Sequence, residues 1–183
     1  MTFEEALKLV GLAEGEYTND PTDSGGETIC GISRKNNPDS KIWEMLDNWK
    51  ERGNTPAQLD KIARGNHEFM ALVNALYRGK YWNTVHCDEF DNLFRYPLFS
   101  CCVLCGITPT IKMFQRALGV KDDGKIGQET YKAARLEYKN ATLEKFYDEW
   151  HEYCDECVRK KPKNAKFIKG WHNRINNVKR DNH

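Results

Sequence analysis

The sequence predicts a mainly α-helical fold, α+β in the broad sense, with a bundle of helices and one small irregular β or turn region near residues 15–33. Two observations predict it. Apolar residues recur three and four positions apart through most of the chain, which is the spacing of an amphipathic helix. Residues 15–31 instead consist largely of Gly, Pro, Asn, Asp and Ser, which favour turns. The 183 residues show no internal repeat and suit one ordinary domain, residues 1–183.

Capping motifs mark the helices of the first half. Thr2 and Glu5 have the spacing of a capping box, and Thr55 and Gln58 repeat it with a proline at the first helical position. Asn66 is a further candidate cap. The helices expected here span 3 to about 15, 40–50, 56–64 and 67–79.

The second half is expected to be entirely helical apart from its turns. Residues 90–105 are mostly apolar and predict a buried helix, and Thr108-Pro109 opens the next one, which Gly119 ends. Residues 121–124 have the composition of a tight turn. The remaining helices are expected to run for about a dozen residues from Gln128, for a long stretch from about Thr142, and from about Asn164 to the end.

Charge and hydropathy exclude several classes of protein. The 28 basic and 27 acidic residues leave a net charge of +1, which argues against nucleic acid as a partner. No run of about 18 apolar residues exists, so we expect no membrane insertion. Residues 158–180 form a basic stretch that fits either an anionic polymer or an ordinary solvated helix end.

The first residues lack the features of a signal peptide, because Glu4 and Glu5 stand where a positive segment should be. We therefore expect synthesis in the cytoplasm and, if the protein acts outside the cell, a specialised route of release. The sequence does not indicate an oligomeric state.

Seven cysteines are present, and the odd count without an export signal predicts reduced, mostly buried thiols. We expect no cofactor and no metal. A structural zinc site is the alternative, because two stretches have ligand-like spacing. These stretches are His151-x-x-Cys154-x-x-Cys157 and Cys101-Cys102-x-x-Cys105.

Two carboxylates near the turn-rich region suit general acid catalysis. Glu14 lies at the expected end of the first helix, where the helix dipole disfavours an ionised carboxylate and so should raise its pKa. Asp23 lies in a Gly- and Ser-rich turn and should stay ionised. Paired carboxyl groups in contrasting environments are typical of glycoside hydrolysis. The alternative is that Glu14 only decorates a helix terminus.

Four stretches resemble glycoside hydrolase family 108, also called secretion-activating proteins, in the lysozyme-like superfamily. Residues 14–32 (EGEYTNDPTDSGGETICGI) resemble the family's signature, and residues 77–82 (YRGKYW) its central Tyr-Trp element. Residues 114–130 resemble its peptidoglycan-binding-type half, and residues 167–174 its closing motif. The resemblance implies a catalytic lobe over 1–90 and a helical peptidoglycan-binding lobe over 91–183.

The resemblance implies an N-acetylmuramidase that cleaves the β-1,4 bond between N-acetylmuramic acid and N-acetylglucosamine in bacterial peptidoglycan. It also implies action at the cell wall or periplasm after holin-assisted or specialised release. Glu14 would be the general acid, Asp23 would stabilise positive charge or activate water, and Thr28 would orient that water. Phage muramidases have a similar Glu, Asp and Thr triad, but the spacing along the chain between Asp23 and Thr28 is one residue shorter than the spacing expected for those enzymes. The residues expected to bind substrate are Tyr17, Gly25, Gly26, Tyr81 and Gln115, whereas Trp82 and Trp171 are expected in the core.

The chain departs from the family pattern at three positions. Glu16 replaces a glycine, and its added charge could raise the pKa of Glu14 further or share its role. Ser100 and Leu104 replace a polar Asp and Asn pair, which puts activity in doubt. A non-catalytic peptidoglycan-binding or secretion-activating protein and a lytic transglycosylase therefore stay open as alternatives.

Overall fold

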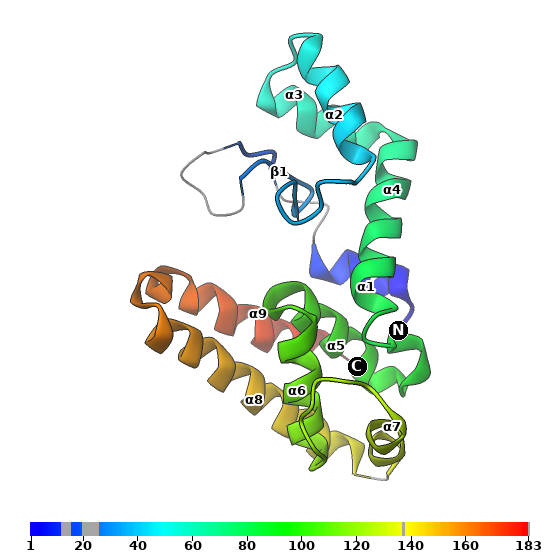
Figure 1. Ribbon diagram of the computed structural model, residues 1–183, viewed down its shortest axis with the longest axis vertical. Coiled ribbons are helices and arrows are strands. Elements are labelled where there is room, and N and C mark those ends of the chain that lie inside the picture. Colours follow the sequence, from blue (N-terminus) through cyan, green and yellow to red (C-terminus); the bar gives the residue numbers. More distant parts are fainter. Residues whose placement is uncertain (12–15, 20–25, 137, 183) are drawn as a thin grey trace. The chain divides into compact units, whose positions relative to one another are not determined.

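The computed structural model describes residues 1–11, 16–19, 26–136 and 138–182 (Figure 1). Helices dominate these ranges, and the described strands form one two-stranded sheet, so the predicted mainly α-helical class is confirmed. The chain divides into two compact units, Leu7–Gly79 and a second unit that joins Met1–Ala6 to Lys80–His183. The predicted division into a catalytic lobe over 1–90 and a peptidoglycan-binding lobe over 91–183 stays a prediction.

Three of the four helices of the first half begin where their caps predict, although the first ends at Val10 and not near residue 15. Thr2 accepts a hydrogen bond from the backbone of Glu5, and the Glu5 carboxylate accepts one from the Thr2 backbone, 2.6 Å away. Thr55 and Gln58 form the second capping box, and Asn66 caps the following helix through the Phe69 N–H. The helices are α1 (Phe3–Val10), α2 (Ile42–Glu51), α3 (Pro56–Gly65) and α4 (His67–Tyr77), which continues into the π-helix η2 (Arg78–Trp82).

The turn-rich segment contains a small antiparallel hairpin, which confirms the predicted small β region near residues 15–33. Strands β1 (Thr28–Ile29) and β2 (Ile32–Ser33) pair Thr28 with Ser33 and Ile29 with Ile32. The two isoleucine side chains are buried, and the Tyr77 hydroxyl donates a hydrogen bond to the Cys30 carbonyl at the turn, 3.1 Å away. A β-bridge between Thr18 and Thr28 adds a third segment to the hairpin. These contacts attach the hairpin to the hydrophobic core of its unit.

The unit that contains the second half is built around aromatic side chains. Phe114 is fully buried, and its ring meets the rings of Phe90, Phe94 and Phe146 at centroid distances of 5.3, 5.2 and 5.8 Å. Trp82 is also fully buried against Phe3 and Phe99, as predicted. The elements are the 3₁₀-helices η3 (Cys87–Glu89) and η4 (Pro162–Phe167) and the helices α5 (Asn92–Cys105), α6 (Ile107–Leu118), α7 (Gln128–Ala134), α8 (Lys139–Lys160) and α9 (Ile168–Asp181).

Three local predictions for this half are wrong. Helix α7 has seven residues instead of about a dozen, because the next apolar side chain, Leu136, is 62% exposed and no packing supports a longer helix. The segment from Asn164 begins as the 3₁₀-helix η4 and becomes α-helical only at Ile168. Trp171 is half-buried instead of a core residue, because its ring stacks on exposed Phe167.

All seven cysteines are free thiols, five buried and two half-buried. Burial raises the pKa of Cys102 to about 12, so this thiol stays protonated at neutral pH.

Within the described ranges, no group of three or more His, Cys, Asp and Glu side chains is arranged to hold a metal ion. His151 of the zinc-like motif instead stacks on His172, with a centroid distance of 4.7 Å. No helix among the described residues could span a membrane.

Candidate functional site

The predicted catalytic residues are described only in part. Glu14, Asp23 and Gly25 lie outside the described residues. Tyr17, Gly26 and Thr28 are described and lie together around the hairpin. Tyr81 and Gln115 belong to the other compact unit.

Thr28 is held rigidly by backbone pairing on both sides. Its N–H donates to the Thr18 carbonyl at 2.8 Å, the Thr18 N–H donates back at 2.9 Å, and Ser33 is its partner on strand β2. The Thr28 hydroxyl donates to the Gly26 carbonyl 3.2 Å away. A hydroxyl oxygen that donates its proton can still accept hydrogen bonds, and within the described residues no donor to Thr28 Oγ1 is present, so it could accept one from a water molecule. This geometry suits the predicted role of orienting a water.

Gly26 has a φ of +64°, the left-handed region that residues with a side chain rarely adopt. A Cβ atom built at this position would meet nothing within 4 Å. The glycine is therefore required by backbone conformation and not by close packing, and its predicted contact with substrate stays a prediction.

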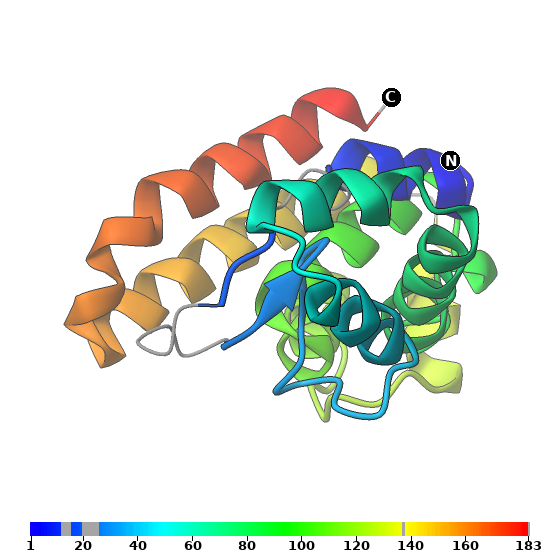
Figure 2. The same cartoon turned by 90° about the horizontal axis from the view of Figure 1, so that it is seen from above.

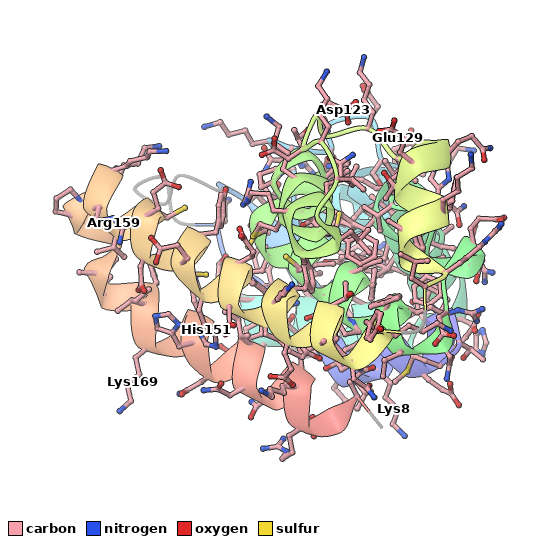
Figure 3. The ribbon with its side chains drawn as sticks, turned by 90° about the horizontal axis from the view of Figure 1, so that it is seen from below. Lys8, Asp123, Glu129, His151, Arg159 and Lys169 are labelled. Atoms are coloured by element: carbon pink, nitrogen blue, oxygen red, sulfur yellow. The ribbon has the colours of Figure 1, made fainter. Side chains whose placement is uncertain are left out.

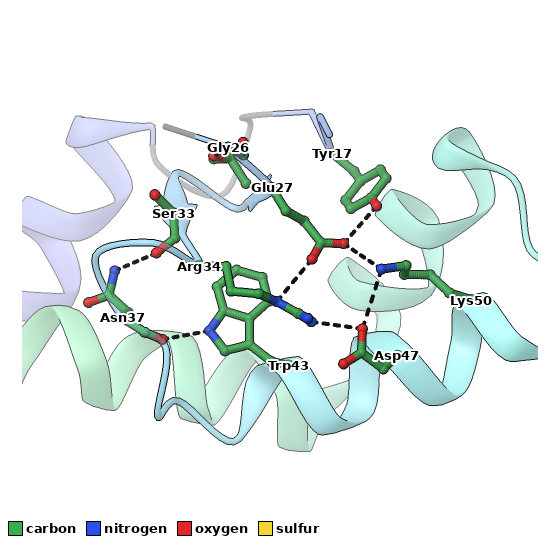
Figure 4. Close-up of polar contacts among 10 residues, drawn as sticks. Tyr17, Gly26, Glu27, Ser33, Arg34, Asn37, Trp43, Asp47 and Lys50 are labelled. Atoms are coloured by element: carbon green, nitrogen blue, oxygen red, sulfur yellow. Dashed lines mark hydrogen bonds and ion pairs between the residues drawn. The ribbon is translucent and has the colours of Figure 1, made fainter. Parts of the chain in front are cut away.

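A buried carboxylate, Glu27, anchors the strand that carries Thr28 (Figure 4). Its side chain is only 9% exposed, and its Oε1 accepts hydrogen bonds from the Tyr17 hydroxyl at 2.8 Å and from Lys50 Nζ at 2.7 Å. Its other oxygen, Oε2, pairs with Arg34 Nε at 2.9 Å. Asp47 on α2 completes the cluster through Arg34 at 2.7 Å and Lys50 at 3.3 Å. We call these five residues the Glu27 cluster.

The cluster holds its members in defined charge states. The hydrogen bond to Glu27 raises the pKa of Lys50, and the hydrogen bond from Arg34 lowers the pKa of Asp47. Burial, together with the hydrogen bond to Glu27, raises the pKa of the Tyr17 hydroxyl. At neutral pH these shifts favour a charged Lys50, an ionised Asp47 and a neutral Tyr17 phenol.

Tyr17 has a second anchor on α3. Its backbone N–H donates to both carboxylate oxygens of Asp60, each 2.8 Å away. The Tyr17 ring is half-buried and its hydroxyl is engaged by Glu27, so only the face of the ring is available for stacking on a sugar. Its predicted role in substrate binding stays a prediction.

Sequence reasoning missed most of the Glu27 cluster. In the sequence, Glu27 is one of several carboxylates in the turn-rich segment, and no local pattern marks Arg34 or Asp60. The spacing of Asp47 and Lys50, three residues apart on an expected helix, is the one local signal that links two members. The other links join residues whose closeness depends on the fold.

Gln115 is buried at 2% exposure, and its amide is fully engaged within its own unit. Its Nε2 donates to Asp123 Oδ1 and to the Lys125 carbonyl, both 2.9 Å away, and its Oε1 accepts from the Gly124 N–H at 2.9 Å. Gln115 therefore pins the loop that follows α6. Gln115 is predicted from the sequence to bind substrate, and a hydrogen bond from its amide to a sugar would have to replace these bonds.

Replacing Gln115 by Ala is expected to lower the free energy of unfolding by about 2 kcal/mol, because the buried Gln115 side chain is lost and the half-buried Gly124 N–H loses its hydrogen-bond acceptor. Urea denaturation measures the change. Replacing exposed Gln128 by Ala is the control and should change stability by less than about 0.5 kcal/mol. A stable Gln115→Ala protein with weakened glycan binding would instead support the substrate-binding prediction.

The remaining candidates lie on or near the aromatic core. Tyr81 is half-buried, burial raises the pKa of its hydroxyl, and Lys80 Nζ lies 5.7 Å from its ring centroid.

Ser100, which departs from the family pattern, is fully buried and accepts a hydrogen bond from Arg174 Nε at 3.2 Å. The closing motif therefore contacts the substituted position directly, and Leu104 beside it is half-buried.

Comparison with known proteins agrees with the resemblance seen in the sequence. The family model for Glycosyl hydrolase 108 matches residues 7–106, and the model for a Predicted Peptidoglycan domain matches residues 109–176. The solved structure of Brucella abortus SagA is similar, with 26% sequence identity, a TM-score of 0.67, and coverage of 96% of this chain and 90% of that chain. A search of curated proteins found no significant match. The chain belongs to the glycosyl hydrolase 108 family and carries a predicted peptidoglycan domain in its second half.

Proposed function

We propose that this protein is a peptidoglycan hydrolase of the N-acetylmuramidase type, with Glu14 as the general acid. The observation that carries the proposal is the family match over residues 7–106, which includes Glu14, Asp23 and Thr28. The adjoining match to a peptidoglycan domain supports peptidoglycan as the substrate.

In the proposed reaction, protonated Glu14 donates its proton to the oxygen that leaves as the glycosidic bond breaks. Asp23 stabilises positive charge on the sugar or accepts a proton from the attacking water. The Thr28 hydroxyl oxygen accepts a hydrogen bond from that water and so fixes its position, while the Glu27 cluster fixes Thr28. The rigidity of Thr28 described above supports this division of roles.

Digestion of purified peptidoglycan, followed by mass spectrometry of the products, tests the proposal. We expect new reducing N-acetylmuramic acid ends, each with the mass of one added water. Anhydro ends would show a lytic transglycosylase, because that reaction adds no water. Unchanged glycan that nevertheless sediments with the protein would show a non-catalytic binding protein and would overturn the proposal.

A further inference from the structure

The α8–α9 hairpin ends in a strongly basic segment. Residues 159–171 comprise the end of α8, all of η4 and the start of α9, and we call them the basic tip. Helix η4 contacts both α8 and α9. Figure 3 shows Arg159 and Lys169 at this end of the hairpin, far from Asp123 and Glu129 in the same unit. The same hairpin is seen from the opposite side in Figure 2.

The basic tip carries positive charge that its own unit does not neutralise. It contains no acidic residue. Arg159 and Lys160 pair with glutamates of α8, at 2.5 and 2.7 Å. Among the described residues, no carboxylate forms an ion pair with the other four lysines, all of which are exposed. These are Lys161, Lys163, Lys166 and Lys169.

An aromatic pair lies among these lysines. Phe167 is 48% exposed, and its ring stacks on Trp171 with a centroid distance of 6.0 Å and an interplanar angle of 24°. Lys166 Nζ lies 4.8 Å from the Phe167 ring centroid. Apolar ring surface next to mobile ammonium groups suits a ligand that combines sugar faces with carboxylates.

Trp171 also lines a small cavity of about 100 Å³. Its other walls come from the end of α5 and from α8, and they are apolar, aromatic or thiol side chains. They are Leu104, Cys105, Tyr153, Cys154 and Cys157. The volume equals that of about three water molecules at roughly 30 Å³ each, which is enough for the methyl end of an acetamido group.

We propose that the basic tip is the peptidoglycan-binding subsite of the second half of the chain. N-acetylated sugars contact Phe167 and Trp171, and the carboxylates of the stem peptides pair with Lys166, Lys169 and their neighbours. The match to a peptidoglycan domain spans residues 109–176 and so includes the whole tip. This inference deepens the proposed function and rests on peptidoglycan being the substrate.

An anionic membrane surface is the competing occupant, and the observations favour the glycan. Binding at a bilayer interface depends on a large apolar area that enters the headgroup region. Phe167 is the one large apolar side chain of the tip that is strongly exposed in the described structure, since Ile168 and Trp171 are half-buried.

The test is co-sedimentation of the full chain with purified sacculi at low temperature, at 50 and 300 mM salt. Phe167→Ala should weaken binding about two- to tenfold. The double variant Lys166→Glu/Lys169→Glu should weaken it at least about tenfold at low salt and reduce its salt dependence. The control Lys121→Glu/Lys125→Glu carries the same charge change on exposed lysines elsewhere in the unit and should bind like the unmodified protein.

The inference is overturned if the unmodified protein does not sediment with sacculi, or if the tip variants bind as well as it does. It is also overturned if they lose binding only to vesicles that contain anionic lipid. Tip-dependent binding without any cleavage would refute the proposed hydrolase but not the subsite, so the two failures are distinguishable.

Discussion

Replacing Glu14 by Gln is expected to lower the rate of peptidoglycan cleavage by about 10²- to 10⁴-fold, the usual contribution of a general acid. Glutamine has nearly the shape of the glutamic acid side chain but carries no proton that it can give to the leaving oxygen. Binding to sacculi and the unfolding transition should stay unchanged. The measurement is the rate of release of reducing ends from sacculi at saturating substrate.

The matched control for this change is Glu16→Gln, because Glu16 is an exposed carboxylate two residues away. If Glu14 is the acid, this control should keep cleavage within a few-fold of the unmodified rate. Equal losses in both variants would mean that the two carboxylates share the role. A Glu14→Gln protein that cleaves normally would refute the assignment of the acid.

Replacing Glu27 by Gln is expected to lower the free energy of unfolding by about 3 kcal/mol. The change leaves Arg34 Nε and Lys50 Nζ without the negative partner that now lies 2.9 and 2.7 Å away, beside a side chain only 9% exposed. Breaking a buried ion pair from one side is costly because charge is left uncompensated, and here Arg34 and Lys50 would have to share the single carboxylate of Asp47. Since Arg34 and Lys50 are each about a third exposed, water reduces the cost below that of a fully buried pair. Urea denaturation measures the loss.

Asp47→Asn is the matched control for Glu27→Gln, because Asp47 contacts the same two cations but is 44% exposed. It should cost less than about 1 kcal/mol. The Glu27→Gln protein should also cleave peptidoglycan more slowly at temperatures where it is folded, since the strand that carries Thr28 loses its anchor. Equal stability losses in the two variants would contradict the central place of Glu27 in the cluster.

The helix starts could be predicted because their signals are local. In each capping box a side chain bonds to a backbone N–H three residues away, so the contact forms in any chain that begins a helix there. The family resemblance likewise depended on runs of adjacent residues, and the comparisons confirm it.

By itself, then, the sequence determined the mainly helical class, the capped helix starts, the hairpin near Thr28 and the family. Tertiary structure alone decided that Glu27 gathers Arg34 and Lys50, that Gln115 bonds to its own loop, and that Trp171 stacks outside the core. The physical reason is distance along the chain. The two ion pairs of Glu27 join residues 7 and 23 positions apart, and whether such groups meet depends on how helices and hairpin pack, which no local pattern encodes.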